Sequence, residues 1–255
     1  SIGVMTAKDD AAQMSQGAGM TFRNSIEWLA GNYNEARMGS SIFSYLMGYE
    51  DPRLNVYFLP MDGNASYGVE AFNGKTYQAV PAGHANAQND IYKSCSKPNI
   101  QSGTPTYWLR ASEVYFLRAE AALVWEGFGS ADSWYKQGID MSFQENGVTE
   151  PVDDYMNSNL SPRAYVLSHY QYGQTLSAPC ETTVKFEGTT EQKLEKIMIQ
   201  KWIALFPNGQ EAWTEWRRTG YPKLNVIKTL KGAVQGATLE GGIRRMIYPT
   251  SFSQT

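Results

Sequence analysis

The sequence predicts a mainly α-helical protein with a loop-rich insertion that holds short strands. Residues 107–126 are rich in alanine, which is the best helix former. Residues 189–192 read Thr-Thr-Glu-Gln, a capping-box pattern that marks the start of a helix. Residues 60–105 are rich in Gly, Asn, Ser and Pro and show no helical period. These three segments together predict helices packed around a long irregular stretch.

The bulk composition is that of a folded domain and excludes some classes of function. The chain has 255 residues, enough for one large domain or two small ones, and 42% of them are hydrophobic. The net charge is −3 and no segment concentrates Lys and Arg, so we expect no nucleic-acid partner. No apolar run of about 18 residues occurs, so no membrane-spanning helix is predicted.

The N-terminal part of the chain predicts short elements. The first 20 residues have weak periodicity, and we expect them to be mobile or extended. Asp51-Pro52-Arg53 ends a helix, because proline disfavours the helical conformation in the residue before it. The other expected elements are a short helix or strand at 21–31, a helix at 39–49 and a strand at 54–59.

The insertion at residues 60–105 is long for a loop in a compact domain, and loops of this length are often functional. Asn73-Gly74 is a turn pair that favours a β-hairpin inside it.

The alanine-rich helix at 107–126 is followed by a glycine turn and a second helical segment at 130–146. One face of the second helix carries Ala131, Tyr135 and Gly138. Small residues at this spacing permit two antiparallel helices to pack closely. The pair resembles one tetratricopeptide-type hairpin, and a single such unit does not make a solenoid.

Three more helices are expected, at 161–172, from 189 to about 205, and at 210–218. An aromatic group around the last two could form a wall that stacks sugar rings. Its tryptophans, however, follow helical spacing, so we favour core packing. They are Trp202, Trp213 and Trp216.

Candidates for catalysis are few. Glu113 and Glu120 lie seven residues apart on one helix face, where two carboxylates could perform acid–base chemistry. Glutamates on a packing helix more often bond backbone or arginine, so we favour a structural role. His84 and His169 are 85 residues apart, and no nucleophile elbow or metal motif accompanies them. We therefore expect no enzyme activity, no metal and no cofactor.

The two cysteines, Cys95 and Cys180, lie outside any Cys-x-x-Cys or Cys/His cluster that would indicate zinc. They can pair if the compartment is oxidising, but we favour two free buried thiols.

Aromatic side chains in and just before the insertion are the candidate ligand-binding residues. The helices need their own aromatics for the core, whereas a loop runs over the surface and cannot bury all of its rings. Exposed rings stack on sugar faces, and nearby amides bond sugar hydroxyls. The predicted binding residues are Trp28, Tyr33, Tyr67, Phe72 and Tyr77. The neighbouring amides are Asn32, Asn34, Asn73 and Asn89.

Two blocks of sequence together resemble one protein family. They are YWLRASEVYFLRAEAAL at 107–123 and QKWIALFPNGQEAWTEWRRTGYP at 200–222. The pairing looks like the SusD/RagB family, in its SusD-like second branch. Further motifs follow in the family order, and the resemblance covers roughly residues 35 to 250. These motifs are Asp51-Pro52-Arg53-Leu54, Tyr67-Gly68, Asn73-Gly74, and Arg244-Arg245 with Tyr248-Pro249.

The resemblance implies a surface lipoprotein of Gram-negative bacteria that captures nutrients for a TonB-dependent outer-membrane transporter. The implied partners are a glycan or peptide ligand and a SusC-like transporter. The implied location is the outer membrane at the cell surface, with membrane contact only through an N-terminal lipid. The motifs are mostly scaffold in such proteins, and the ligand residues vary with the nutrient.

Family members run to near twice this length, and the chain resembles only their C-terminal half. The N-terminal tetratricopeptide helices, a signal peptide and a lipid-bearing cysteine are not in it. We therefore interpret residues 1–255 as a single SusD-like region from the C-terminal part of a longer protein.

The function expected from the resemblance is substrate binding for an outer-membrane nutrient importer, with no chemistry of its own. The first alternative is a helical glycoside hydrolase, which requires two carboxylates about 5–10 Å apart in a cleft. The second is a structural helical-repeat scaffold, which would have no ligand-sized aromatic cleft.

Overall fold

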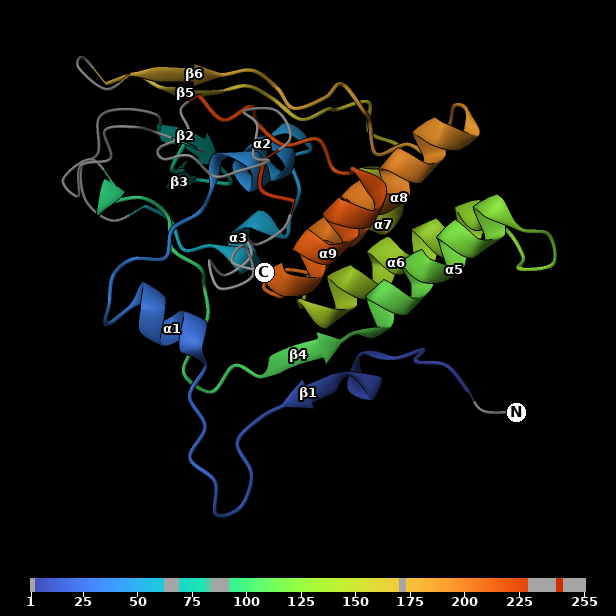
Figure 1. The fold of residues 1–255 in the computed structure, drawn as a ribbon, viewed down its shortest axis with the longest axis horizontal. Helices are drawn as coiled ribbons and strands as arrows, with labels where there is room; N and C mark the ends of the chain where they lie inside the picture. The colour runs from blue at the N-terminus through green and yellow to red at the C-terminus, as the bar shows by residue number, and fades with distance from the viewer. Residues whose placement is uncertain are drawn as a thin grey trace, which may run out of the picture.

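The computed structural model is mainly helical, as the sequence predicts (Figure 1). It describes residues 3–61, 69–81, 83, 92–169, 173–228 and 242–244. Figure 1 shows a layer of long helices on one side, a group of short helices and hairpins on the other, and a two-stranded ribbon beneath both. The ribbon joins the N-terminal segment to the strand that leads into the long helices.

The described helices are η1 (Lys8–Asp10), α1 (Ser25–Ala30), α2 (Ser40–Gly48), α3 (Leu54–Tyr57), α5 (Ala111–Val124), α6 (Ala131–Glu145), α7 (Val152–Met156), α8 (Thr190–Ala204) and α9 (Gly209–Thr219). The described strands are β1 (Ala12–Met14), β2 (Val69–Phe72), β3 (Lys75–Gln78), β4 (Thr106–Leu109), β5 (Tyr165–Leu167) and β6 (Gln174–Leu176). They pair antiparallel as β1–β4, β2–β3 and β5–β6.

The antiparallel hairpin predicted at 107–146 is confirmed as α5 and α6, but its first helix begins at Ala111, and the helix predicted for residues 107–109 is wrong because they belong to strand β4. Gly138 lies at the crossing, where a Cβ atom would come within 2.7 Å of the ring of Phe116. Tyr135 packs edge-on against the same ring, with the centroids 6.4 Å apart. The missing side chain of Gly138 is therefore what allows the two helices to approach at this point.

Helices α8 and α9 cover the hairpin, and both begin where the sequence predicts. Thr189 and Gln192 form the expected capping box at the start of α8. The Asn208 side chain caps α9 by accepting from the backbone N–H of Glu211. Gly220 ends α9 with a left-handed φ of 77°, a conformation that glycine adopts without strain.

The β-hairpin predicted near Asn73-Gly74 is confirmed, because β2 and β3 flank this turn. The strand predicted at 54–59 is wrong, since residues 54–57 form helix α3. Leu54 and Tyr57 are both buried, and their spacing of three places them on one helix face.

The helix predicted at 161–172 is also wrong. Tyr165 and Leu167 are buried while Val166 between them is exposed, a period of two that fits a strand better than a helix. This strand, β5, pairs with β6. Residues 170–172 of the predicted helix lie outside the described residues.

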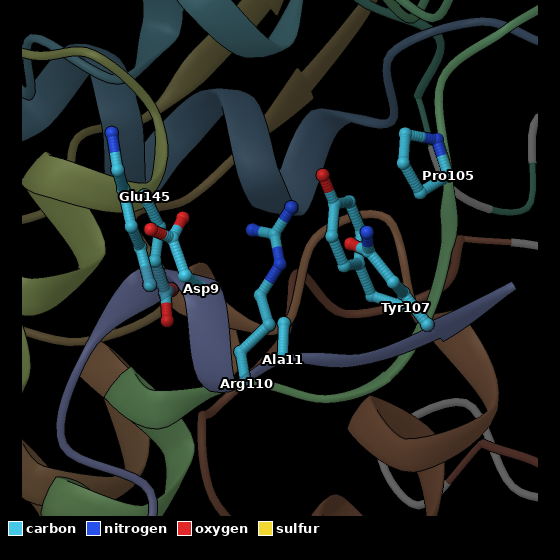
Figure 2. Close-up of a pocket in the computed structure, with 8 residues that line it drawn as sticks. Asp9, Ala11, Pro105, Tyr107, Arg110 and Glu145 are labelled. Atoms are coloured by element: carbon cyan, nitrogen blue, oxygen red, sulfur yellow. The ribbon is translucent and has the colours of Figure 1, made fainter. Parts of the chain in front are cut away.

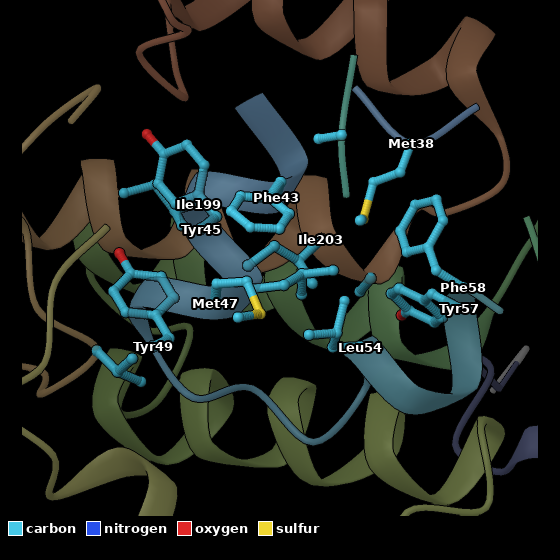
Figure 3. Close-up of a cluster of buried hydrophobic side chains, with 14 of the residues drawn as sticks. Met38, Phe43, Tyr45, Met47, Tyr49, Leu54, Tyr57, Phe58, Ile199 and Ile203 are labelled. Carbon is cyan, nitrogen blue, oxygen red and sulfur yellow. The ribbon is translucent and has the colours of Figure 1, made fainter. Parts of the chain in front are cut away.

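The main hydrophobic core lies between the short helices and the long-helix layer (Figure 3). Phe43 and Tyr45 from α2 are fully buried in it, as is Ile203 from α8. The core tryptophans predicted on α8 and α9 differ in burial. Trp216 is buried, Trp202 is partly buried against the core, and Trp213 is half-buried with its indole N–H donated to the Ile243 carbonyl, 3.1 Å away.

A buried polar network crosses this core. The guanidinium of Arg53 donates to both carboxylate oxygens of Asp51, at 2.9 and 2.6 Å. It also donates to Ser142 on α6 and to Gln200 on α8, at 3.0 and 2.7 Å. The Tyr155 hydroxyl donates to Asp51 at 2.6 Å. The segment at 51–53 is therefore hydrogen-bonded to helices α6, α7 and α8, in addition to following the end of α2.

Candidate functional site

The strongest candidate site is a pair of exposed aromatic rings on and just after α1. Trp28 is 43% exposed and Tyr33 is 60% exposed. Their rings stack with centroids 5.2 Å apart and an interplanar angle of 30°. We call this pair the aromatic platform. Two large rings that are partly open to solvent and already ordered against each other are suited to receive a flat apolar ligand face.

Helix α1 is short but firmly anchored at its start. Asn24, which is buried, caps the helix by accepting from the backbone N–H of Ile26 at 3.0 Å. Its side-chain amide donates to the carbonyl of Thr104 at 2.9 Å, and its backbone N–H donates to the carbonyl of Ser102. The segment before β4 therefore fixes the position of the platform.

The turn after α1 fixes the second ring. The backbone N–H of Tyr33 donates to the carbonyl of Trp28 at 3.0 Å, so the chain folds back and brings the two rings together. Asn34 follows with a left-handed φ of 58°, which asparagine tolerates better than most residues. Its side-chain oxygen accepts from Arg37 at 2.7 Å. The platform is therefore held by backbone geometry as well as by stacking.

A polar cluster, which we call the polar rim, is formed by residues that neighbour the platform in the sequence. Arg23 forms an ion pair with Glu27 at 2.7 Å and donates to the side-chain oxygen of Asn32 at 2.9 Å. The hydrogen bond from Arg23 lowers the pKa of Glu27, so this carboxylate is ionised at neutral pH. The rim offers amide and guanidinium donors together with a carboxylate acceptor, the groups that bond sugar hydroxyls.

The other predicted binding residues do not join the platform. Tyr77 is fully buried in the core, and its hydroxyl donates to Asn55 at 2.6 Å, so the expectation that it forms an exposed ligand surface is wrong. Phe72 is half-buried against the core on β2. Figure 1 shows the β2–β3 hairpin well apart from α1. Tyr67 lies outside the described residues, as does Asn89.

The two carboxylates weighed as an acid–base pair are engaged in ion pairs. Glu120 accepts two hydrogen bonds from Arg218, at 2.7 and 2.8 Å. Glu113 is buried 3.6 Å from the ammonium of Lys201, which lies closer to Glu215 at 2.9 Å. Burial raises the pKa of Glu113 to about 7. The arrangement links α5, α8 and α9, as the structural interpretation predicts.

Both cysteines are free thiols, with Cys95 buried and Cys180 partly buried. Among the described residues, no group of three or more His, Cys, Asp and Glu side chains could hold a metal ion. Within the same part of the chain, no helix combines the length and the apolar character needed to cross a membrane.

A pocket of about 330 Å³ that the sequence did not predict lies at the start of α5 (Figure 2). Its polar lining comes from η1, β1, β4, the N-cap residue just before α5 and the end of α6. Tyr107 and Arg110 belong to the first family-like block, but nothing in the sequence showed that they would meet the N-terminal segment. That meeting depends on the pairing of β1 with β4.

The chain resembles solved structures over nearly its whole length. A homologue of SusD from Bacteroides thetaiotaomicron is 34% identical with a TM-score of 0.85, and the match covers 99% of this chain and 51% of that one. One from Bacteroides vulgatus is 34% identical with a TM-score of 0.85, over 99% and 50% of the two chains. A chitin-binding homologue of SusD from Flavobacterium johnsoniae is 33% identical with a TM-score of 0.83, over 99% and 50%.

The chain therefore spans about half the length of these solved relatives. No curated protein sequence matches it. The SusD-like family, described as "Susd and RagB outer membrane lipoprotein", matches residues 1–255. The predicted resemblance is thus confirmed: the chain belongs to the SusD-like family of outer-membrane lipoproteins.

Proposed function

We propose that this chain is the glycan-binding C-terminal region of a lipid-anchored protein at the cell surface. In this proposal the aromatic platform holds a glycan and the whole protein passes it to a SusC-like TonB-dependent transporter. The observation that carries the proposal is the stacked, exposed pair of Trp28 and Tyr33 with its polar rim. Membership of the outer-membrane lipoprotein family and the chitin-binding relative support it.

The chemistry of the platform suits a sugar better than a peptide. One face of a pyranose ring presents C–H groups that pack on an aromatic ring, while its hydroxyls point outward in the ring plane. Trp28 and Tyr33 supply the flat face, and Arg23, Glu27 and Asn32 supply donors and an acceptor beside it. Such a site needs no rearrangement of the protein, because stacking and hydrogen bonds already order both rings.

The proposal assigns binding and no reaction to this region. A glycosidase requires two carboxylates placed across the scissile bond, one of them free to donate a proton. Glu113 and Glu120, the pair weighed from the sequence, are committed to Lys201 and Arg218 inside the helix layer. Transport energy in this scheme comes from the partner complex.

Family membership is what supports the transporter partner and the lipid anchor in this proposal. We propose that residues 1–255 are one SusD-like region of a longer protein whose N-terminal half carries the lipid. The chain spans only about half of its solved relatives, in line with this division. Peptides remain the alternative ligand class.

A screen of glycans and peptides against the full-length protein tests the function. The parent should bind at least one glycan, and the Trp28→Ala, Tyr33→Ala double variant should bind it much more weakly. A matched control is Trp125→Ala, because Trp125 is also exposed, at 61%, and lies beside another ring, that of Phe128. The proposal fails if the double variant binds like the parent, or if only peptides bind.

A further inference from the structure

The pocket at the start of α5 is built from segments far apart in the sequence. Its polar side chains are Lys8 and Asp9 from η1, Gln13 from β1, Tyr107 from β4, Arg110 and Glu145. Figure 2 shows the Arg110 side chain rising between Tyr107 on one side and Asp9 and Glu145 on the other. A volume of about 330 Å³ is at the lower end of the range for small-molecule sites. It suits one sugar ring rather than an extended chain.

Arg110 is held in place but incompletely bonded. Its guanidinium lies over the ring of Tyr107, 3.7 Å from the centroid. The Nη1 atom is shielded from solvent, and no hydrogen-bond acceptor reaches it from the part of the chain that the structure describes. A shielded N–H group without an acceptor is unfavourable. Arg110 also lines the pocket, and its planar guanidinium carries several N–H groups, so the side chain can donate there to a ligand oxygen.

Glu145 supplies a fixed acceptor on the opposite side. Its two carboxylate oxygens accept from the backbone N–H and the hydroxyl of Ser112, at 3.0 and 2.6 Å. These bonds cap α5, whose own N-cap residue forms no side-chain cap. Each carboxylate oxygen accepts one bond from Ser112 and has a second lone pair. The carboxylate is thus oriented by the helix and still able to accept from a ligand.

The charge balance of the lining indicates the class of ligand. Lys8 and Arg110 are cationic, and Asp9 and Glu145 are anionic, so the polar wall has no net charge. A ligand that fits must accept from Arg110 and donate to the carboxylates. Hydroxyl groups do both, whereas a carboxylate or phosphate only accepts and would lie against two like charges.

The pocket and the aromatic platform are joined by one short stretch of chain. Asn24, which caps the platform helix, donates to the carbonyl of Thr104. The next residue, Pro105, lines the pocket, and Tyr107 follows two positions later. Three residues span at most about 10 Å. The N-terminus of the platform helix and the pocket are therefore linked through β4 and the residues just before it.

We infer that the Arg110 pocket is a second sugar subsite that takes one neutral, uncharged sugar ring of a glycan also held at the aromatic platform. This inference rests on the proposed function for the identity of the larger ligand. Arg110 and Glu145 bond the ring hydroxyls from two sides, and the platform stacks another unit of the same glycan. Neither group reacts with the sugar.

Ligand-detected saturation-transfer NMR on the full-length protein tests this pocket separately from the platform. The background is the Trp28→Ala, Tyr33→Ala variant, in which the platform is removed. The probes are glucose, galactose, mannose and N-acetylglucosamine, with glucuronate and galacturonate as the acidic arm. At least one neutral sugar should bind this background, and adding Arg110→Gln should weaken it at least tenfold. Arg110→Lys, which keeps the charge but loses the planar fork, serves if Arg110→Gln does not fold.

Arg118→Gln is the matched control, because Arg118 lies on α5, the helix that Arg110 precedes, and its guanidinium also stacks on an aromatic ring, 3.4 Å from the Trp134 centroid. It should leave sugar binding unchanged. The inference is overturned if no neutral sugar binds the background, if only the uronates bind, or if the Arg110 and Arg118 variants behave alike. The proposed role of the aromatic platform is tested separately. It is contradicted if the Trp28→Ala, Tyr33→Ala variant binds the glycan as tightly as the parent does.

Discussion

Tyr33 and Tyr77 lie in similar sequence surroundings, but one ring is exposed and the other is buried. Tyr33 lies between Asn32 and Asn34, Tyr77 lies between Thr76 and Gln78, and the sequence predicts that both face a ligand. Tyr33 follows α1, is 60% exposed and stacks on Trp28. Tyr77 is on β3, is fully buried and donates its hydroxyl to Asn55. The difference lies in the covering elements, because β2–β3 packs against the core whereas α1 stands at its edge (Figure 1).

An aromatic ring in a loop-rich segment is thus available for binding only where the protein's own core does not bury it. The buried region should therefore respond to substitution through stability, and the platform through binding. Measurements of the free energy of unfolding separate the two.

The largest effect is expected for Asp51→Ala in the buried network. Removing this carboxylate leaves the guanidinium of Arg53 buried without its counter-charge. Breaking a buried ion pair in this way costs roughly 3–5 kcal/mol. Urea denaturation of parent and variant measures it. A loss below about 1 kcal/mol would show that the network does not hold the helices together.

Tyr77→Ala should also destabilise the protein, by roughly 3–5 kcal/mol, because it leaves a large cavity in the core. Tyr77→Phe keeps the ring and loses only the hydrogen bond to Asn55, so a loss of about 1 kcal/mol is expected. Glycan binding of the phenylalanine variant should match the parent. If Tyr77→Phe bound the glycan more weakly than the parent without losing stability, Tyr77 would be part of the ligand site.

Glu113 gives the helix layer a pH dependence. Burial raises its pKa from 4.5 to about 7 in the folded protein, so the folded state holds a proton that the unfolded state releases. The stabilisation is fully present below about pH 4.5 and is lost as the pH rises to about 7. A shift of this size corresponds to about 3 kcal/mol.

Two neighbouring glutamates contribute to this environment. Glu211 and Glu215 face Glu113 from α9 and disfavour its ionisation, while Lys201 opposes them from α8. Burial also pushes the pKa of Glu215 up, but hydrogen bonds from Arg218 and Lys201 outweigh it and hold that pKa below its usual value. Glu113→Gln should therefore abolish the fall in unfolding free energy between pH 5 and about 7. The same fall in both proteins would contradict this assignment.

The sequence predicted those parts of the fold that depend on local patterns. The capping box at Thr189 and the turn at Asn73-Gly74 act through neighbouring residues, so both were predicted correctly. The strand β5 was missed because its alternation covers only three residues. Helix α3 was missed because its burial depends on contacts with distant helices.

The candidate site was predictable only in part, for the same physical reason. Trp28 and Tyr33 are five residues apart, and a tight turn after a short helix brings them together. The Arg110 pocket depends on β1 pairing with β4, nearly 100 residues away in the sequence. Nothing local to Tyr107 or Arg110 encodes that pairing, so residue type alone could not identify the pocket.

The smallest effect on stability is expected for Trp28→Ala and Tyr33→Ala. These two variants also test most directly whether the aromatic platform binds a glycan. Both rings are exposed, so each change should alter the free energy of unfolding by no more than about 0.5 kcal/mol. Isothermal titration with the glycan identified in the screen measures binding on the same samples. Each variant should weaken binding by roughly 1–3 kcal/mol, on the scale of stacking on flat rings. Parent-like affinity in both variants would contradict glycan binding by the platform.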